Sequence, residues 1–361
     1  MPAVNGQEAG HTLNWLPANR RAHRGCGRKP ECPPGENPRR HGEDQDQTWV
    51  LRTVRPTLCS CSIVPPSFVF IKYYAVHDFG DLSFHHPEMD EPYMNVKFPR
   101  TVGGATKKLS GAVSRAVGAG HTLVMLGGDH SLGIGSVAGH AQQCPDLCVI
   151  WVDAHADVNT PLSSPSGNLH GQPVAFMLKE LQDKVPDLPG FSWVKPFLSC
   201  RDLVYIGLRD VDPGEYHILK NLGIQYFTMR DIDRLGIQRV TEVALDHLLA
   251  RKQRPIHLSF DIDAFDPSLA PATGTPVNGG LTYREGIYIT EEVHNTGLLS
   301  VMDLVEVNPV VGATRAAVEA TASLAVDVIA SSLGQTREGA HGVIDEIPST
   351  KEDDDTEQLC L

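Results

Sequence analysis

The segment of residues 147–157 reads LCVIWVDAHAD and gives the clearest indication of the fold. Its first six residues are all apolar, and such an unbroken run is typical of a strand buried on both faces of a parallel sheet. The rest alternates acid or histidine with alanine, which places Asp153, His155 and Asp157 on one side of an extended backbone. Ligands bind at the carboxyl ends of strands in open parallel sheets, so the segment predicts a central strand that ends in a binding site.

Apolar runs and helical patterns alternate from about residue 100 onward. The runs at Thr122–Leu126 and at 203–207, 224–227, 256–260 and 301–307 are also expected to be strands. Helical stretches are expected near 105–118, 135–143, 172–182, 214–222, 238–251, 284–296 and 315–333. This order predicts an α/β fold, with a mostly parallel central sheet and helices on both of its faces. Neither a G-x-G-x-x-G fingerprint nor a P-loop follows a strand, so nothing supports a nucleotide-binding site.

Composition excludes several classes of protein. The 361 residues are 41% hydrophobic and 21% charged, which is ordinary globular composition. No apolar run reaches the roughly 18 residues that a membrane span needs, so we expect no membrane partner. A net charge of −13 disfavours phosphate binding, so we expect no nucleic-acid partner. The eight cysteines form no C-x-x-C pair, which makes a zinc ribbon or a disulfide scaffold a poor interpretation.

The two ends of the chain differ from its middle. Residues 1–60 hold nine Lys and Arg against six Asp and Glu, whereas the other 301 hold 22 against 38, so the net charges are +3 and −16. Residues 1–48 are rich in glycine and proline without apolar periodicity, and we expect them to be disordered. Their arginines fit a mitochondrial presequence, but Glu31 and Glu36 do not, so the import signal is weak. The acidic run 352–355 predicts a solvated tail.

Acids and histidines follow four of the expected strands. A single such residue would be interpreted as a turn or helix cap, because aspartate is favoured there. Six of them behind hydrophobic strands would be uncompensated buried charge without cations. The set therefore predicts a metal site formed by His130, Asp153, His155, Asp157, Asp261 and Asp263.

The donor types indicate which metal binds and how many ions the site holds. Four carboxylates and two imidazoles, without a thiolate, suit Mn²⁺. Six side chains are too many for one open catalytic ion, but they suit two ions that share carboxylates and hold a hydroxide between them. The sequence thus predicts metal-assisted hydrolysis.

Polar residues downstream of this cluster are candidates for substrate binding. Residues 159–170 include amides and a hydroxyl that suit a small polar substrate, and His170 is interpreted either as a proton-transfer group or as a surface histidine. Glu306 follows the last strand and would need a cationic partner if buried, which a cationic substrate provides. The acids of residues 210–215 either start a helix or meet an α-amino group.

Five motifs resemble those of the arginases, the manganese ureohydrolases. They are residues 127–131 (GGDHS), 153–157 (DAHAD), 166–173 (SGNLHGQP), 259–263 (SFDID) and 306–309 (EVNP). The resemblance covers about residues 76–341, and residues 146–151 and 333–339 look most like the vertebrate mitochondrial, non-hepatic type. It implies an arginase/deacetylase-like three-layer α/β/α domain and a homotrimer. It also implies hydrolysis of L-arginine to L-ornithine and urea by a hydroxide that bridges two Mn²⁺ ions.

The resemblance also implies a role for each residue. One ion would be held by His130, Asp153, Asp157 and Asp261, and the other by Asp153, His155, Asp261 and Asp263. Asp157 would help to protonate the leaving amine, His170 would be the proton shuttle, and Glu306 would face the guanidinium. The α-carboxylate would contact Asn159, Ser166 and Asn168, and the α-amino group would contact Asp212 with help from Glu215. Arg284 and Arg337 match trimer contacts.

The front of the chain departs from the family pattern. Arginases open with a strand and a glycine-rich loop, which residues 1–75 do not contain. A parallel crossover needs a dozen or more residues, and the segment 55–67 that follows the β-like residues 49–54 is broken by prolines, so we expect an internal strand to be missing. We therefore expect an atypical, largely disordered region 1–75, a catalytic domain 76–341 and an acidic flexible tail 342–361. The resemblance implies a mitochondrial protein, with the cytoplasm as the alternative.

Two other functions fit the same residues. An agmatinase-like or other guanidino ureohydrolase would keep the metals and change the 159–170 loop. An inactive, arginase-like interaction protein would result if the altered front disrupted the fold.

Overall fold

The computed structural model describes residues 49–56, 74–85 and 87–338. Eight strands form one sheet in the order β2-β1-β3-β8-β7-β4-β5-β6. The strands are β1 (Trp49–Pro56), β2 (Tyr74–Leu82), β3 (Thr122–Leu126), β4 (Cys148–Val152), β5 (Leu203–Leu208), β6 (Gln225–Thr228), β7 (Ile256–Asp261) and β8 (Leu299–Val305). The disorder expected for 1–48 and the tail expected at 342–361 lie outside the described residues.

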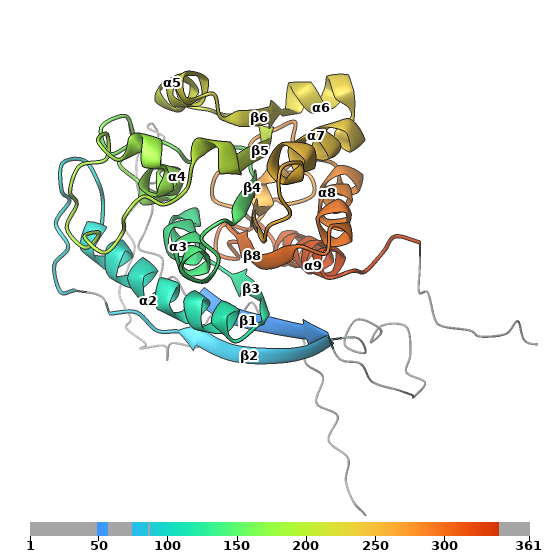
Figure 1. Cartoon of the computed structure of the whole chain (residues 1–361), viewed down its shortest axis with the longest axis horizontal. Coiled ribbons are helices and arrows are strands. Elements are labelled where there is room, and N and C mark those ends of the chain that lie inside the picture. The colour runs from blue at the N-terminus through green and yellow to red at the C-terminus, as the bar shows by residue number, and fades with distance from the viewer. Residues whose placement is uncertain (1–48, 57–73, 86, 339–361) are drawn as a thin grey trace, which may run out of the picture.

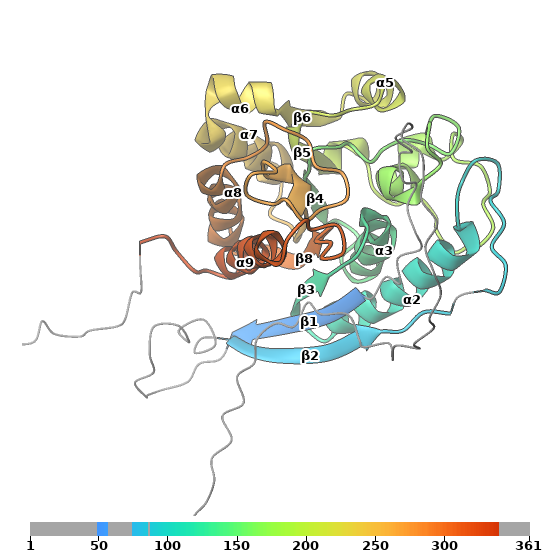
Figure 2. The same ribbon diagram turned by 180° about the vertical axis from the view of Figure 1, so that it is seen from behind.

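Helices cover both faces of the sheet, as the opposite views in Figures 1 and 2 show. One face packs against α2 (Pro99–Gly118), α3 (Gly133–Gln143), α4 (Pro173–Met177) and α5 (Pro213–Leu222). The other face packs against α6 (Met229–Leu235), α7 (Ile237–Leu249), α8 (Tyr283–Asn295) and α9 (Arg315–Ser332). The three-layer α/β/α class predicted for the chain is therefore confirmed.

The six strands from β3 to β6 in this order are all parallel, as predicted. Every residue of β4 and of β5 is buried, which explains why both strands read as unbroken apolar runs. The short helix α6 was not expected, although its start carries a capping box in which Thr228 and Asp231 bind each other's backbone. None of the helices in the described part of the chain is both long and apolar enough to cross a membrane.

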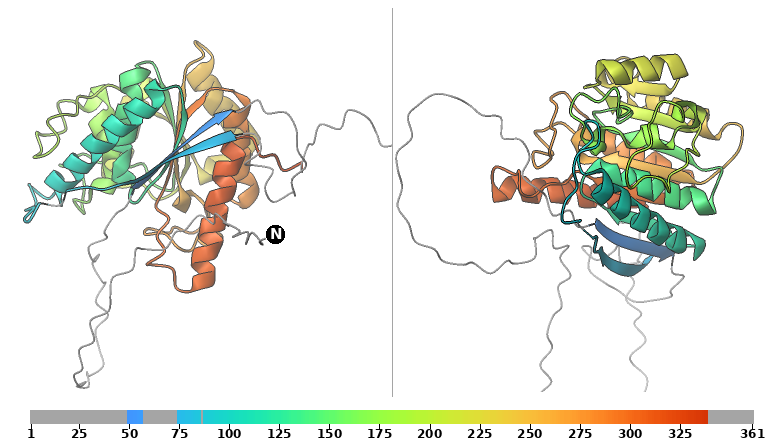
Figure 3. Two further views of the ribbon diagram at one scale, coloured as in Figure 1. Left: turned by 90° about the horizontal axis from the view of Figure 1, so that it is seen from below. Right: turned by 90° about the vertical axis from the view of Figure 1, so that its left-hand side faces the viewer.

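Strand β1 occupies the place where a strand was expected to be missing. It lies between β2 and β3 and runs antiparallel to both, with Val50 opposite Leu126 and Val54 opposite Thr122. Figure 3 shows β1 and β2 side by side, and its right-hand view places them below the other strands. The expectation of a gap is wrong for this backbone, because an antiparallel strand needs no parallel crossover and a proline-rich segment can follow it. β2 becomes the edge strand, and Val76 and Phe79 on it are exposed.

Candidate metal centre and active site

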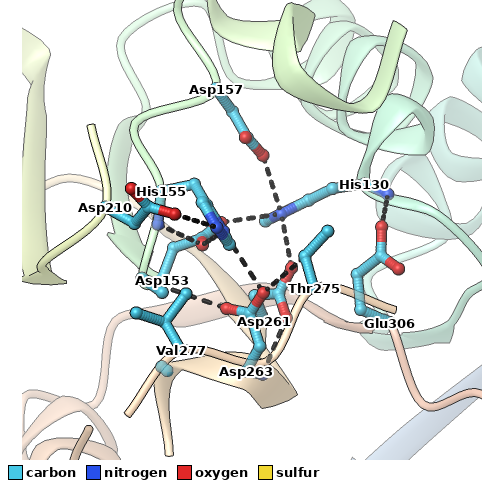
Figure 4. A network of polar contacts seen from close by, with 12 residues as sticks. His130, Asp153, His155, Asp157, Asp210, Asp261, Asp263, Thr275, Val277 and Glu306 are labelled. Carbon is cyan, nitrogen blue, oxygen red and sulfur yellow. Dashed lines mark hydrogen bonds and ion pairs between the residues drawn. The ribbon is translucent and has the colours of Figure 1, made fainter. Parts of the chain in front are cut away.

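The six predicted metal ligands converge at the carboxyl edge of the sheet (Figure 4). His130 opens a 3-10 turn just after β3, and Asp153, His155 and Asp157 follow β4. Asp261 is the last residue of β7, and Asp263 lies in the 3-10 turn that comes next. All are buried except His155, whose side chain is 23% exposed. Three strand ends therefore deliver the whole set to one place, as the sequence predicted.

His130 faces three carboxylates at once. Its Nδ1 lies 3.0 Å from Asp153 Oδ2 and 3.2 Å from an oxygen of each of Asp157 and Asp261. Nevertheless, Nδ1 has no hydrogen-bond partner among the described residues, while Nε2 lies 2.8 Å from Ser259 Oγ. A buried ring nitrogen that points into three acids without a properly aligned bond is the arrangement that a shared cation requires.

A second group of donors shares Asp153 with the first. His155 Nδ1 lies 3.4 Å from Asp153 Oδ1 and 3.2 Å from Asp263 Oδ2. The two oxygens of Asp153 thus face different histidines. Two groups can each hold a metal ion, namely His130 with Asp153 and Asp157, and Asp153 with His155 and Asp263. Asp261 joins the first group through His130, and its other oxygen accepts a hydrogen bond from the backbone N–H of Asp263 at 2.8 Å.

The backbone and a tryptophan hold these side chains in place. Trp151 stacks on His130 with ring centroids 4.0 Å apart and planes 12° apart, and its Nε1 donates to Asp153 Oδ2 at 3.0 Å. Asp157 and Glu306 have φ values of 50° and 64°, in the left-handed region that disfavours residues other than glycine. Such strain persists only where the surrounding structure enforces it, and it concentrates at functional sites.

Burial and mutual charge shift the pKa values of the cluster. Burial lowers the pKa of His155, but hydrogen bonds and charge from Asp153 and Asp263 together outweigh burial and raise it to about 12. Burial and the neighbouring Asp153 raise the pKa of Asp157 to about 6. Burial also raises the pKa of Asp261 well above its usual range, reinforced by the charges of Asp263 and Asp153. The cluster therefore binds cationic charge strongly, whether as protons or as metal ions.

Glu306 lies beside the cluster rather than in it. Its Oε1 accepts a hydrogen bond from the backbone N–H of His130 at 2.9 Å, which Figure 4 shows on the far side of His130 from Asp157. Burial raises the pKa of Glu306 to about 7, against the lowering effect of the nearby His170. His170 lies in the 3-10 turn Leu169–Gly171 and is half-buried. The structure thus brings both residues to the edge of the metal cluster.

Two of the predicted substrate contacts are joined by a hydrogen bond. Asn159 Nδ2 donates to Asp212 Oδ2 at 2.8 Å, so residues 53 positions apart are joined. Glu215 is buried, and its two oxygens accept from the backbone N–H groups of Val158 and Asp212, each at 3.0 Å. Burial raises its pKa to about 8, reinforced by the charge of Asp157. Because both oxygens are occupied, Glu215 acts as a support for Asp212 rather than as an open contact.

Sequence comparison identifies the family to which the chain belongs. A model described as the arginase family matches residues 61–334. The chain belongs to the arginase family. A Xenopus laevis protein named "Arginase, non-hepatic 1" is 68% identical over 290 residues, covering 78% of this chain and 81% of that protein. Human "Arginase-2, mitochondrial" is 66% identical over 281 residues, covering 78% and 79%.

Solved structures of the arginase family share the fold. The arginase of Bacillus subtilis superposes with a TM-score of 0.64 at 34% identity, over 72% of this chain and 85% of that one. The arginase of Entamoeba histolytica in complex with L-ornithine superposes with a TM-score of 0.62 at 30% identity, over 70% and 83%.

Sequence reasoning missed Arg209, which organises the metal centre from the end of β5. Its guanidinium donates to the carbonyl oxygens of Asp263 at 2.6 Å, Ala264 at 3.1 Å, Phe265 at 3.2 Å and Val277 at 2.8 Å. The arginine therefore ties the turn that carries Asp263 to the loop that follows it. Its position directly after a strand was the only signal in the sequence.

Thr275 and Lys97 were also missed. Thr275 Oγ1 donates to Asp263 Oδ2 at 3.1 Å, from the loop that Figure 4 shows beside that acid. Lys97 Nζ donates to Asn168 Oδ1 at 2.9 Å across 71 positions of sequence. No motif links either residue to its partner, because both contacts depend on how distant loops pack.

The predicted trimer-contact residues lie together. Arg337 Nη2 lies 2.6 Å from Glu291 Oε2, and Arg337 Nη1 donates to the backbone carbonyl of Arg284 at 3.3 Å. Arg284 and Arg337 line a surface hollow with Ile237 and Tyr288. The two arginines are thus neighbours on one surface.

Proposed function

We propose that the chain hydrolyses L-arginine to L-ornithine and urea. The observation that carries the proposal is the position of His130 Nδ1, 3.0–3.2 Å from three carboxylates, together with a second donor group that shares Asp153. Membership of the arginase family and the names of the relatives support arginine as the substrate.

The residues fit two Mn²⁺ ions per chain. We assign His130, Asp153, Asp157 and Asp261 to one ion and Asp153, His155, Asp261 and Asp263 to the other. Carboxylate and imidazole donors without thiolate favour Mn²⁺ over softer metals. When bound, such a pair of ions supplies a hydroxide nucleophile at neutral pH and stabilises charge on the tetrahedral centre.

The protein's own residues bind the substrate and move protons. Glu306 accepts hydrogen bonds from the guanidinium of arginine. Hydrolysis breaks a bond between the guanidinium carbon and the nitrogen that becomes the amine of ornithine, and Asp157 passes a proton to that nitrogen. His170 exchanges protons with the solvent.

The far end of the substrate is bound by a separate set of groups. Asn159, Ser166 and Asn168 donate hydrogen bonds to the α-carboxylate. Asp212 accepts from the α-amino group, and Glu215 fixes the backbone of Asp212. The two ends of L-arginine thus need different groups. An acid faces the guanidinium cation, whereas amides and a hydroxyl face the α-carboxylate.

The same proposal extends to the organisation of the protein. We assign residues 76–341 to the catalytic domain, preceded by an atypical region 1–75 that contributes β1 and the start of β2, and followed by an acidic tail 342–361. Arg284 and Arg337 are placed at the contacts of a homotrimer. The names of the mammalian relatives support a mitochondrial location, which a fusion of residues 1–75 to a fluorescent protein tests directly.

Purified protein loaded with manganese tests the function. We expect about two ions per chain by mass spectrometry, and urea release from L-arginine with kcat/KM up to about 10⁴–10⁵ above that for agmatine, which lacks the carboxylate. Similar values for the two substrates would indicate an agmatinase-like enzyme. Two bound ions without urea release from either substrate would indicate an inactive interaction protein.

A further inference from the structure

The segment that leads into α2 is docked on the substrate loop. Lys97 N donates to Gly167 O at 3.0 Å, and Asn95 Nδ2 donates to Ser164 O at 2.7 Å. Gly167 has a φ of +71°, and a Cβ on it would lie 1.7 Å from Asn95 O, so only glycine fits there. The backbone of Lys97 is therefore fixed against the loop that carries Ser166 and Asn168.

The side chain of Lys97 sets the orientation of an amide. Its ammonium donates to Asn168 Oδ1 at 2.9 Å. An ammonium can only donate hydrogen bonds, so the reversed amide would bring two donors together. The Asn168 oxygen thus accepts a hydrogen bond from Lys97, and the Nδ2 group of Asn168 remains able to donate to another partner. That partner must be an acceptor such as a carboxylate.

Ser166 is left as a donor in the same way. Its Oγ accepts a hydrogen bond from the backbone N–H of Asn168 at 3.2 Å, so its hydroxyl hydrogen is available. Gln172 Nε2 holds the backbone carbonyl of Asn168 at 2.9 Å and keeps the turn in place. Two neighbouring donors are therefore held ready for one anion, and one of them depends on Lys97.

Lys97 also changes the charge around the far end of the substrate. The residues assigned to that end above are neutral (Asn159, Ser166 and Asn168) or acidic (Asp212 and Glu215). Lys97 adds a cation on the side of Asn168. Because Lys97 is exposed, solvent screens its field, so the hydrogen bond matters more than the charge at a distance.

We propose that Lys97 is a positioning residue for the substrate's α-carboxylate and acts by orienting the amide of Asn168. This inference rests on the function proposed above. It predicts that Lys97 affects substrates with an α-carboxylate and leaves those without one unchanged.

The test compares L-arginine with agmatine in Lys97→Met. We expect kcat/KM for L-arginine to fall about 10–50-fold, mainly through KM, because an oriented hydrogen bond to a charged group is lost. The value for agmatine should change by less than about 2-fold. Lys97→Arg keeps a charged donor and should recover most of the loss. Lys107→Met, which removes an exposed lysine of α2, is the matched control and should leave both values unchanged.

A double-mutant cycle isolates the pair. In the Asn168→Ala background, Lys97→Met should cost less than about 2-fold for L-arginine, because the amide that it orients is absent. Equal losses for L-arginine and agmatine, or a full loss that persists without Asn168, would overturn the proposal.

Calorimetric measurement of L-ornithine binding tests the role of Lys97 independently of the proposed hydrolysis of L-arginine. Lys97→Met should raise the dissociation constant of L-ornithine about 10-fold while the unfolding midpoint stays unchanged. If the unmodified chain released no urea from L-arginine, the proposed function would fail. The ornithine measurement would still decide on Lys97, since equal dissociation constants would exclude its role.

Discussion

At the scale of single residues, Asp153 differs from the other acids of the cluster. Its Oδ2 lies 3.0 Å from His130 Nδ1 and its Oδ1 lies 3.4 Å from His155 Nδ1, so one carboxylate serves both donor groups. Asp263 approaches only the second histidine, at 3.2 Å. The two acids look alike in sequence, each lying in an Asp-x-His or Asp-x-Asp motif, but the structure gives them unequal positions.

Removing charge from these two acids should therefore have unequal effects. We expect Asp153→Asn to retain less than about one Mn²⁺ per chain and Asp263→Asn to retain about one, because only the former takes a ligand from both ions. Metal analysis after equilibrium dialysis measures this directly, with Asp183→Asn, which changes an exposed acid outside both donor groups, as the control. The same loss of metal in both variants would contradict the shared role of Asp153.

At the scale of elements, Arg209 joins the end of β5 to the turn and loop that follow β7. One guanidinium donates to the backbone carbonyl oxygens of four residues in this region, and no carboxylate takes part in these bonds. Burial lowers the pKa of Arg209, although the nearby acids of the metal centre oppose this effect. The arginine thus stabilises, by hydrogen bonds, the conformation of the backbone that carries Asp263.

We expect Arg209→Met to lower the free energy of unfolding by about 2–4 kcal/mol, since each hydrogen bond to a charged group contributes roughly 1.5–3 kcal/mol and leaves a buried carbonyl when lost. Urea denaturation measures the change, and limited proteolysis between residues 266 and 279 should become faster. Arg201→Met, at an exposed position before β5, is the control. Unchanged stability and proteolysis would show that the loop holds itself in place.

Removal of strand β1 should destabilise the sheet. The strand pairs with both β2 and β3, so its removal exposes one side of β3 within the sheet. A chain that starts at residue 57 should unfold at a lower temperature than one that starts at residue 49, because each buried backbone group left unpaired costs about 1–3 kcal/mol. Circular dichroism melts of the two truncations provide the comparison. Equal midpoints would mean that β1 contributes nothing to the sheet.

At the scale of the whole molecule, burial of the site links stability to pH. Burial raises the pKa of Glu215 from 4.5 to about 8 and that of Glu306 from 4.5 to about 7, and it raises that of Asp157 from 3.8 to about 6. His155 also binds its proton more tightly. Burial lowers its pKa, but the hydrogen bonds and charges of Asp153 and Asp263 raise it from 6.5 to about 12. In each case the folded protein holds a proton that the unfolded chain releases, so stability falls as pH rises between about 4.5 and 8.

Metal-free protein should therefore melt at a lower temperature at about pH 8 than at about pH 5. Manganese should reverse this slope, because metal binding displaces the protons of the ligands Asp157 and His155 and strengthens as pH rises. Melts across this range with a chelator and with excess Mn²⁺ test both halves. A metal-free protein that gains stability toward pH 8 would contradict the raised pKa values of these residues.

The parallel core of the sheet and the convergence of the candidate metal ligands could be predicted from local sequence patterns. Unbroken apolar runs such as residues 147–152 mark buried strands, and the carboxyl ends of parallel strands share one edge, so Asp153, His155 and Asp261 had to meet there. Both signals are local, and the sheet geometry supplies the rest.

The packing of the domain sets the direction of β1, the hydrogen bonds of Glu215 to two backbone N–H groups, and the contacts of Lys97 and Arg209. The sequence signals are limited to the position of Arg209 after a strand and the acids at 210–215 that could start a helix. The other contacts depend on which distant segment packs against which. Antiparallel pairing of β1 with β3 removed the need for a crossover, and Lys97 reached Asn168 only because Gly167 lets two backbones touch. Periodicity and motifs describe neighbours along the chain, whereas hydrogen bonds between loops are set by the packing of the whole domain.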